Sequence, residues 1–276
     1  MCKNQNENCR IISVTLNKGG VGKTTTCINL GVALAKQGHS VLLVDLDPQG
    51  HLAVGLGYNP NKFKVTVANL LYSAIDGFPL QDDNILIPVS ENLDLLPSNR
   101  KLAAVSERLT FAKTQDRLDD DIPQSEDVLK FVLSEYRNRY NYIIIDCQPN
   151  VSVLTRNALV AADSVILPIE AHYLAYEGLS ETLDIISMIK KRFNPDLKIE
   201  GILLTKYQSR TNLCRKIRDD VEKAYAGTVN IFAEPVSYSI RAAEQSAVGM
   251  SIFDYDANSA VANAYTELAR EVSMNA

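Results

Sequence analysis

The chain has 276 residues, of which 46% are hydrophobic and 22% are charged, and this composition is typical of a globular protein rather than a disordered or collagen-like one. The formal net charge of −5 excludes a strongly basic nucleic-acid binder at the level of the whole chain, although it leaves room for a local basic patch. The five cysteines include no C-x-x-C pair, which argues against a zinc ribbon or a disulfide framework.

The start of the chain indicates a cytoplasmic protein. Residues 1–10 are polar and lack the apolar segment of a secretory signal, so we expect them to form a flexible N-terminal tail. No apolar run in the sequence approaches the roughly 18 residues that a membrane-spanning helix needs. Because no linker rich in Gly, Pro or Ser follows, residues 11–276 are expected to form a single domain.

Strand and helix patterns then alternate along the chain. Apolar strand patterns, mostly short runs of Val, Ile and Leu, are found at residues 11–16, 41–44, 142–145, 165–167 and 199–204. Helical patterns are found at residues 24–36, 128–136, 179–191 and 213–225. This alternation predicts an α/β fold with a mostly parallel twisted sheet and helices on both faces. Residues 100–125, which include the acidic run 119–121, are interpreted as a solvated loop.

The segment between the first strand and the first helix, residues 17–25, reads NKGGVGKTT. Glycines bring backbone N–H groups close together, and these groups, with the positive end of the helix dipole, bind phosphate oxygens. We expect Lys23 to reach the β- and γ-phosphates and the Thr24 hydroxyl to bind Mg²⁺. Asn17 stands where the common P-loop pattern has its first glycine, and Lys18 precedes the glycine pair instead.

This form, K-G-G-x-G-K-[ST], is the deviant Walker A motif of the SIMI class of P-loop ATPases. It predicts binding of ATP with Mg²⁺ as cofactors. The residues expected to bind the nucleotide are Lys18, Gly19, Gly20, Val21, Gly22, Lys23, Thr24 and Thr25.

Acidic residues end two of the predicted strands. Asp45 and Asp47 follow the strand at 41–44, and Asp146 ends the strand at 142–145. Because ligands of open α/β sheets bind at the carboxyl ends of the strands, we expect these side chains to converge on the phosphate loop. Asp146 and Asp45 are candidate metal ligands, acting directly or through water, and Asp47 is a candidate for orienting the attacking water. A strand-end aspartate that only caps a helix is the structural alternative.

With these motifs the chain resembles the ParA/Soj partition ATPases, in the short form without an N-terminal DNA-binding extension. The resemblance extends over roughly residues 11–272. The matching segments are 18–26, 41–50, 143–146, 157–168, 176–179 and 201–212. The chain departs from the family at Gln148, where the family usually has proline, and across residues 236–246, where only Arg241 and Glu244 clearly match.

The resemblance implies a mechanism that the motifs alone do not. Members of the family form a homodimer with ATP between the subunits, and Lys18 would then reach the partner's phosphates and act in catalysis with Lys23 and Asp47. The dimer would bind DNA without sequence preference, with Arg210 and Arg241 at the matching positions. A ParB-like centromere-binding protein would stimulate hydrolysis, and the protein would be associated with the nucleoid rather than with a membrane.

Three other functions share this ATPase core. A MinD-like positioning ATPase binds membranes through a basic amphipathic helix, but the C-terminal apolar stripe at residues 257–272 has no cationic face. An iron–sulfur relative needs more cysteines near Cys147 than the sequence provides. A ligase-type synthetase is the third alternative, because a fold does not determine a function.

Overall fold

The computed structural model describes residues 9–77, 85–112, 125–172, 175–225 and 227–274. The strands it contains form one seven-stranded sheet in the order β3-β4-β2-β5-β1-β6-β7, in which β3 pairs antiparallel with β4 and all other pairs are parallel. The strands are β1 (Arg10–Val14), β2 (Val41–Leu46), β3 (Ile87–Ser90), β4 (Leu93–Leu96), β5 (Tyr142–Cys147), β6 (Ser164–Glu170) and β7 (Lys198–Thr205). The predicted α/β architecture is therefore confirmed.

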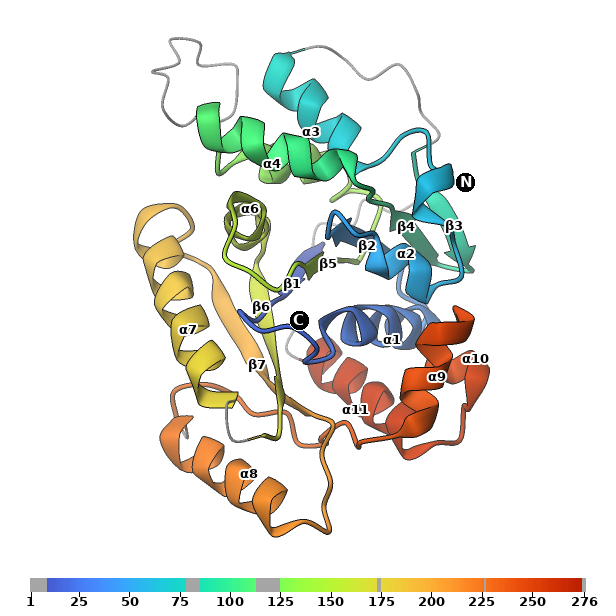
Figure 1. The fold of residues 1–276 in the computed structure, drawn as a ribbon, viewed down its shortest axis with the longest axis vertical. Coiled ribbons are helices and arrows are strands. Elements are labelled where there is room, and N and C mark those ends of the chain that lie inside the picture. The colour runs from blue at the N-terminus through green and yellow to red at the C-terminus, as the bar shows by residue number, and fades with distance from the viewer. Residues whose placement is uncertain (1–8, 78–84, 113–124, 173–174, 226, 275–276) are drawn as a thin grey trace.

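Helices cover both faces of the sheet (Figure 1). One core cluster joins the sheet to α3 (Val67–Asp76), α4 (Lys101–Ala112), α5 (Val128–Ser134), α6 (Val153–Ala161), α7 (Ala175–Arg192) and α8 (Asn212–Tyr225). The other joins it to α1 (Lys23–Lys36), α2 (His51–Gly55), α10 (Ile252–Tyr255) and α11 (Ala260–Met274). A 3₁₀ turn at Pro60–Lys62 and the helix α9 (Ile240–Val248) complete the described helical elements.

The central strands are apolar throughout because both of their faces are covered. Every residue of β2 and β5 is buried, which explains why the sequence shows continuous apolar runs here rather than alternation. In the sheet register, Asp146 of β5 lies beside Val14 of β1 on one side and beside Asp45 of β2 on the other. The topology thus brings the ends of three strands together at one edge.

The fold begins slightly earlier than we expected. β1 starts at Arg10, whose guanidinium donates to the Val272 carbonyl at 2.6 Å and forms an ion pair with Glu200. Cys9 is buried as well. Both residues therefore belong to the folded part, and residues 1–8 of the predicted tail lie outside the described residues.

The region from 100 to 125, which we interpreted as a loop, contains the helix α4. Leu102, Val105 and Leu109 follow a helical spacing and are all buried in the core cluster that contains α3 and α6. The loop interpretation is wrong for residues 101–112, because apolar residues at this spacing form the buried face of an amphipathic helix. The acidic run 119–121 itself lies outside the described residues.

The C-terminal apolar stripe is core. Val261, Tyr265, Leu268 and Val272 of α11 are buried in the cluster that also contains α1, so this stripe is not a surface face. Within the described ranges, no helix combines the length and the apolar character needed to span a membrane.

Candidate functional site

The loop between β1 and α1 is shaped by glycines in a conformation that other residues rarely adopt. Gly20 has φ 75° and Gly22 has φ 87°, both in the left-handed region. Gly22 is the N-cap of α1 and carries no side chain that could cap the helix, and the first helical bond runs from the Thr26 N–H to the Gly22 carbonyl. The backbone N–H groups of the first turn are therefore available to an anion.

Two neighbouring elements hold this loop in place. At its start, the Asn17 N–H donates to the Thr182 hydroxyl of α7 at 3.0 Å, and Gly178 allows α7 to approach, since a Cβ there would lie 3.2 Å from the Asn17 carbonyl oxygen. In its middle, the Thr205 hydroxyl at the end of β7 donates to the Val21 carbonyl at 2.9 Å. The loop is thus fixed by contacts from outside its own sequence.

Lys23, the lysine at the start of α1, points back along the loop. Its ammonium donates to the Lys18 carbonyl at 2.6 Å and to the Leu16 carbonyl at 3.2 Å. Burial lowers the pKa of Lys23, and the negative charge of Asp146 opposes this shift. A buried ammonium held by backbone carbonyls has exchangeable partners, so its donors can be redirected to phosphate oxygens.

Asp146, near the end of β5, has one carboxylate oxygen that is not used by the described part of the protein. It is buried, its Oδ1 accepts from the Cys27 thiol at 3.7 Å, and no described residue donates to its Oδ2. Burial raises its pKa to about 7, while a hydrogen bond from Thr24 and the charge of Lys23 act in the opposite direction. A buried carboxylate oxygen without a donor is suited to a cation or to the water bound to one.

Asp45 is also buried, but its oxygens are used by the backbone. They accept from the N–H groups of Asp47 at 2.9 Å and Leu52 at 3.2 Å, so Asp45 anchors the turn that leads into α2. Burial raises its pKa well above the usual value, and the neighbouring Asp146 adds to the shift. The metal role assigned to Asp45 from the sequence stays a prediction.

Asp47, two residues after Asp45, is slightly more exposed to the solvent. Its Oδ1 accepts from the Gln49 N–H at 2.9 Å, and its Oδ2 lies 2.7 Å from Nδ1 of His51. Its side chain is 12% exposed. Both oxygens are therefore oriented, and the carboxylate faces the same cavity as the loop.

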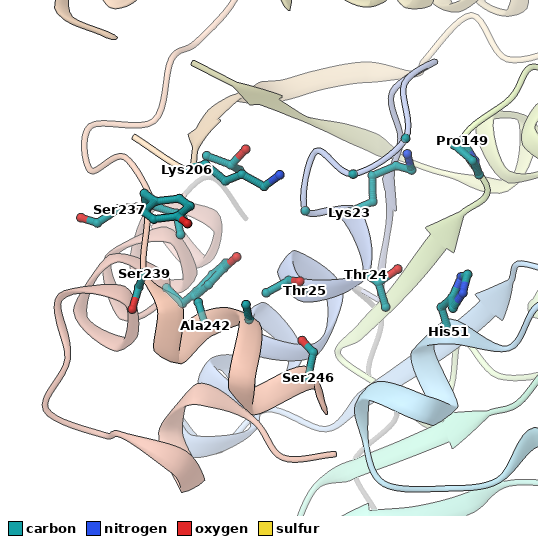
Figure 2. A pocket seen from close by; sticks show the side chains of 18 of the residues that line it. Lys23, Thr24, Thr25, His51, Pro149, Lys206, Ser237, Ser239, Ala242 and Ser246 are labelled. Atoms are coloured by element: carbon teal, nitrogen blue, oxygen red, sulfur yellow. The ribbon is translucent and has the colours of Figure 1, made fainter. Parts of the chain in front are cut away.

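This cavity has a volume of about 400 Å³ and two unlike walls (Figure 2). One wall is formed by the glycine loop, Asp47 and His51. The other, which we call the C-terminal wall, is formed by Lys206, Val236, Ser237, Tyr238, Ser239, Ala242, Ala243, Ser246 and Tyr265. The sequence motifs did not indicate the C-terminal wall or His51. The sequence contains one indirect signal, because most of this wall falls in residues 236–246, where the chain departs from its family.

The two arginines proposed for DNA contact lie outside this cavity in different surroundings. Arg210 is exposed in the turn between β7 and α8 and forms no ion pair with another described residue. Arg241 is exposed on α9 and forms an ion pair with Asp256. The positive charge of Arg241 is therefore partly neutralised, whereas no described carboxylate neutralises that of Arg210.

A strand, a glycine loop and a helix that presents a buried lysine and a threonine, with a carboxylate on the adjacent strand, define a P-loop nucleotide hydrolase. A family model described as an AAA domain matches residues 9–199. The sporulation initiation inhibitor protein Soj of Bacillus subtilis is 40% identical over 266 residues, which cover 96% of this chain and 99% of Soj. The chromosome partitioning protein ParA of Caulobacter vibrioides is 35% identical over 264 residues, covering 95% and 93%. The chain belongs to the ParA/Soj family of partition ATPases.

A solved structure agrees with this fold. Cobyrinic acid a,c-diamide synthase from Mycobacterium smegmatis, with bound ATP analog and magnesium, has a TM-score of 0.80 and 34% sequence identity. The match covers 97% of this chain and 95% of that one. The resemblance stated from the motifs is confirmed at the level of the family and the fold.

Proposed function

We propose that this protein is a DNA partition ATPase that binds ATP and Mg²⁺, dimerises in the ATP state and binds DNA without sequence preference. One observation carries the proposal: the buried Asp146, on the strand next to β1, has an Oδ2 to which no described residue donates, and the glycine loop that follows β1 leads into a helix whose first turn is uncapped. Membership of the ParA/Soj family supports the partition role.

Thr24 and Asp146 are the residues that fit Mg²⁺. Among the described residues, no group of three or more His, Cys, Asp or Glu side chains is arranged to hold a metal ion. This suits Mg²⁺, which keeps several waters and is commonly bound through one or two protein oxygens together with substrate phosphates. When bound, the ion would neutralise charge on the β- and γ-phosphates. Its charge would also favour the ionised form of Asp146, whose pKa burial raises.

The two lysines have separate roles in the proposal. Lys23 leaves the carbonyls of residues 16 and 18 and contacts the β- and γ-phosphates of its own subunit. Lys18 contacts the phosphates bound by the partner subunit, where an added cation offsets the repulsion between two nucleotides that face each other. Asp47, oriented by two hydrogen bonds, accepts a hydrogen bond from the attacking water and so aligns it.

DNA binding is assigned to a local basic surface that begins at Arg210. The neighbouring helix α8 adds Arg215, Lys216 and Arg218, although Arg218 is partly neutralised by Glu222 at 2.8 Å. Dimerisation doubles this surface, so phosphate contacts accumulate only in the ATP state. A ParB-like protein would then stimulate hydrolysis and release the dimer. The protein would act in the cytoplasm, associated with the nucleoid.

A ligase-type synthetase is the second candidate function, since the aligned part of the synthase from M. smegmatis is 34% identical to this chain in sequence. Stimulation of ATP turnover discriminates the two. A partition ATPase responds to DNA and a ParB-like protein, whereas a synthetase responds to a small carboxylic acid with an amine donor. The MinD-like alternative would need a membrane-binding helix, and the apolar stripe of α11 is already buried in the core.

Gel filtration tests the proposed function. The protein is run with Mg-ATP, with Mg-ADP and without nucleotide, each with and without duplex DNA of unrelated sequence. We expect a dimer only with ATP, and DNA to elute with the protein only in that sample. A monomer in all three states, or DNA binding that is independent of nucleotide, would overturn the proposal.

A further inference from the structure

His51 is a polar member of the cavity that no motif accounts for. It is the first residue of α2, and its Nδ1 lies 2.7 Å from Oδ2 of Asp47. The His51 side chain is 60% exposed, whereas that of Asp47 is only 12% exposed. Figure 2 shows the imidazole near Thr24, at the edge of the cavity.

The turn between these two residues fixes their relative position. The Gly50 N–H donates to the Asp47 carbonyl at 2.9 Å and closes the turn. Gly50 has φ 69°, and a Cβ there would lie 2.6 Å from Cβ of Pro60, so only glycine fits. The start of α2 is also tied to Asp45 through the Leu52 N–H. The contact between imidazole and carboxylate is therefore built into a rigid backbone.

The contact between His51 and Asp47 is expected to contribute little to the free energy of unfolding. An exposed imidazole buries almost no apolar surface, and ion pairs at the surface contribute little to the free energy of unfolding. The contact does restrict the Asp47 carboxylate. Gln49 donates to one oxygen, and an Nδ1–H of His51 donates to the other, so the side chain loses its rotational freedom. Each oxygen keeps a second lone pair that can accept a hydrogen bond from water.

We propose that His51 is a positioning residue that holds Oδ2 of Asp47 in the orientation needed to align the attacking water. The inference rests on the proposed function, in which Asp47 orients that water. His51 acts through Asp47 and contacts neither the phosphates nor the metal. Its loss is therefore expected to lower kcat and to leave the KM for ATP nearly unchanged.

Asparagine is the informative substitution. Its Nδ2 stands the same number of bonds from Cβ as Nδ1 of histidine, so His51→Asn keeps a donor to Asp47 and removes the rest of the ring. We expect His51→Ala to lower kcat about tenfold, as loss of one orienting hydrogen bond would. His51→Asn should recover most of that loss. His172, an exposed histidine after β6, supplies the matched control His172→Ala, which should keep the wild-type kcat.

The experiment measures kcat, KM for ATP and Tm for the wild type and for each variant, together with Asp47→Ala and the double variant His51→Ala/Asp47→Ala. If His51 acts through Asp47, the double variant is no slower than Asp47→Ala. Multiplicative losses, equal kcat for His51→Ala and His51→Asn, or a raised KM with unchanged kcat would overturn the inference. If the wild type hydrolyses ATP and His51→Ala has the same kcat, the role of His51 is overturned and the proposed function is not. A wild type without ATP hydrolysis overturns the proposed function as well.

Discussion

The two walls of the cavity are built in different ways. On the loop wall, Lys23 and Asp47 are buried, and the loop itself is tied by hydrogen bonds to β7 and α7. On the C-terminal wall, Tyr238 is 56% exposed, and the small residues Ala242 and Ser246 face the cavity from α9. A rigid wall suits chemistry, which needs groups fixed before the reaction, whereas an open wall of small side chains suits the admission of a ligand.

The largest effect is expected from Lys18, which directly precedes the glycines of the loop wall. Lys18→Ala removes the cation assigned to the partner's phosphates, so ATP-dependent dimerisation and hydrolysis should both be lost, by about a hundredfold or more. Gel filtration and a phosphate-release assay measure the two. Lys101→Ala, at the exposed start of α4, is the matched control. A Lys18→Ala protein that dimerises and hydrolyses ATP normally would contradict a role in trans.

Asp146 is expected to lower the free energy of unfolding, because its carboxyl group is buried. Its pKa of about 7 exceeds the usual 3.8, so the folded state binds more protons than the unfolded state between those values. The free energy of unfolding therefore falls as pH rises through this window. Asp146→Asn should abolish Mg²⁺-dependent hydrolysis, yet raise Tm without Mg²⁺ by about 5 °C at pH 8 and by less at pH 5. Thermal melts that show no gain at pH 8 would contradict it.

A substitution on the C-terminal wall should change binding rather than chemistry. Ser246→Leu adds volume where α9 faces the cavity, so the KM for ATP should rise about tenfold while kcat changes less than about twofold. Steady-state kinetics separate the two. Ser106→Leu, in the middle of α4 and away from the cavity, is the control. A fall in kcat with unchanged KM would mean that this wall also takes part in the chemistry.

The smallest effects are expected from the two arginines. Arg210→Ala should lower ATP-dependent DNA affinity about threefold and reduce the slope of log K against log salt by about 1. Arg241→Ala should have less effect, because Asp256 already neutralises this cation, and Asp256→Asn should strengthen DNA binding. Fluorescence anisotropy at several salt concentrations measures each. Equal losses for both arginines, or no dependence on salt, would contradict this ranking.

How far the sequence predicts each wall follows from where its residues lie in the chain. Each part of the loop wall is a short segment at the end of one strand, so the motif spacing was sufficient to find Lys23 and Asp47. The C-terminal wall combines Lys206, Ser246 and Tyr265, which come from three separate elements and meet only through packing. His51 was missed for another reason: it directly follows the predicted segment 41–50, and its contact with Asp47 is visible only once Gly50 closes the turn.

The hydroxyl at the end of β7 also has a mechanical consequence. Only a residue with a side-chain donor at position 205 can keep the hydrogen bond to the Val21 carbonyl. The backbone of β7 continues from Thr205 into the turn that carries Arg210. If a bound triphosphate displaces the glycine loop, either the hydrogen bond between Thr205 and Val21 breaks or the end of β7 moves with the loop. One hydrogen bond thus joins the glycine loop to the end of β7, and the backbone continues from there into the turn that carries Arg210.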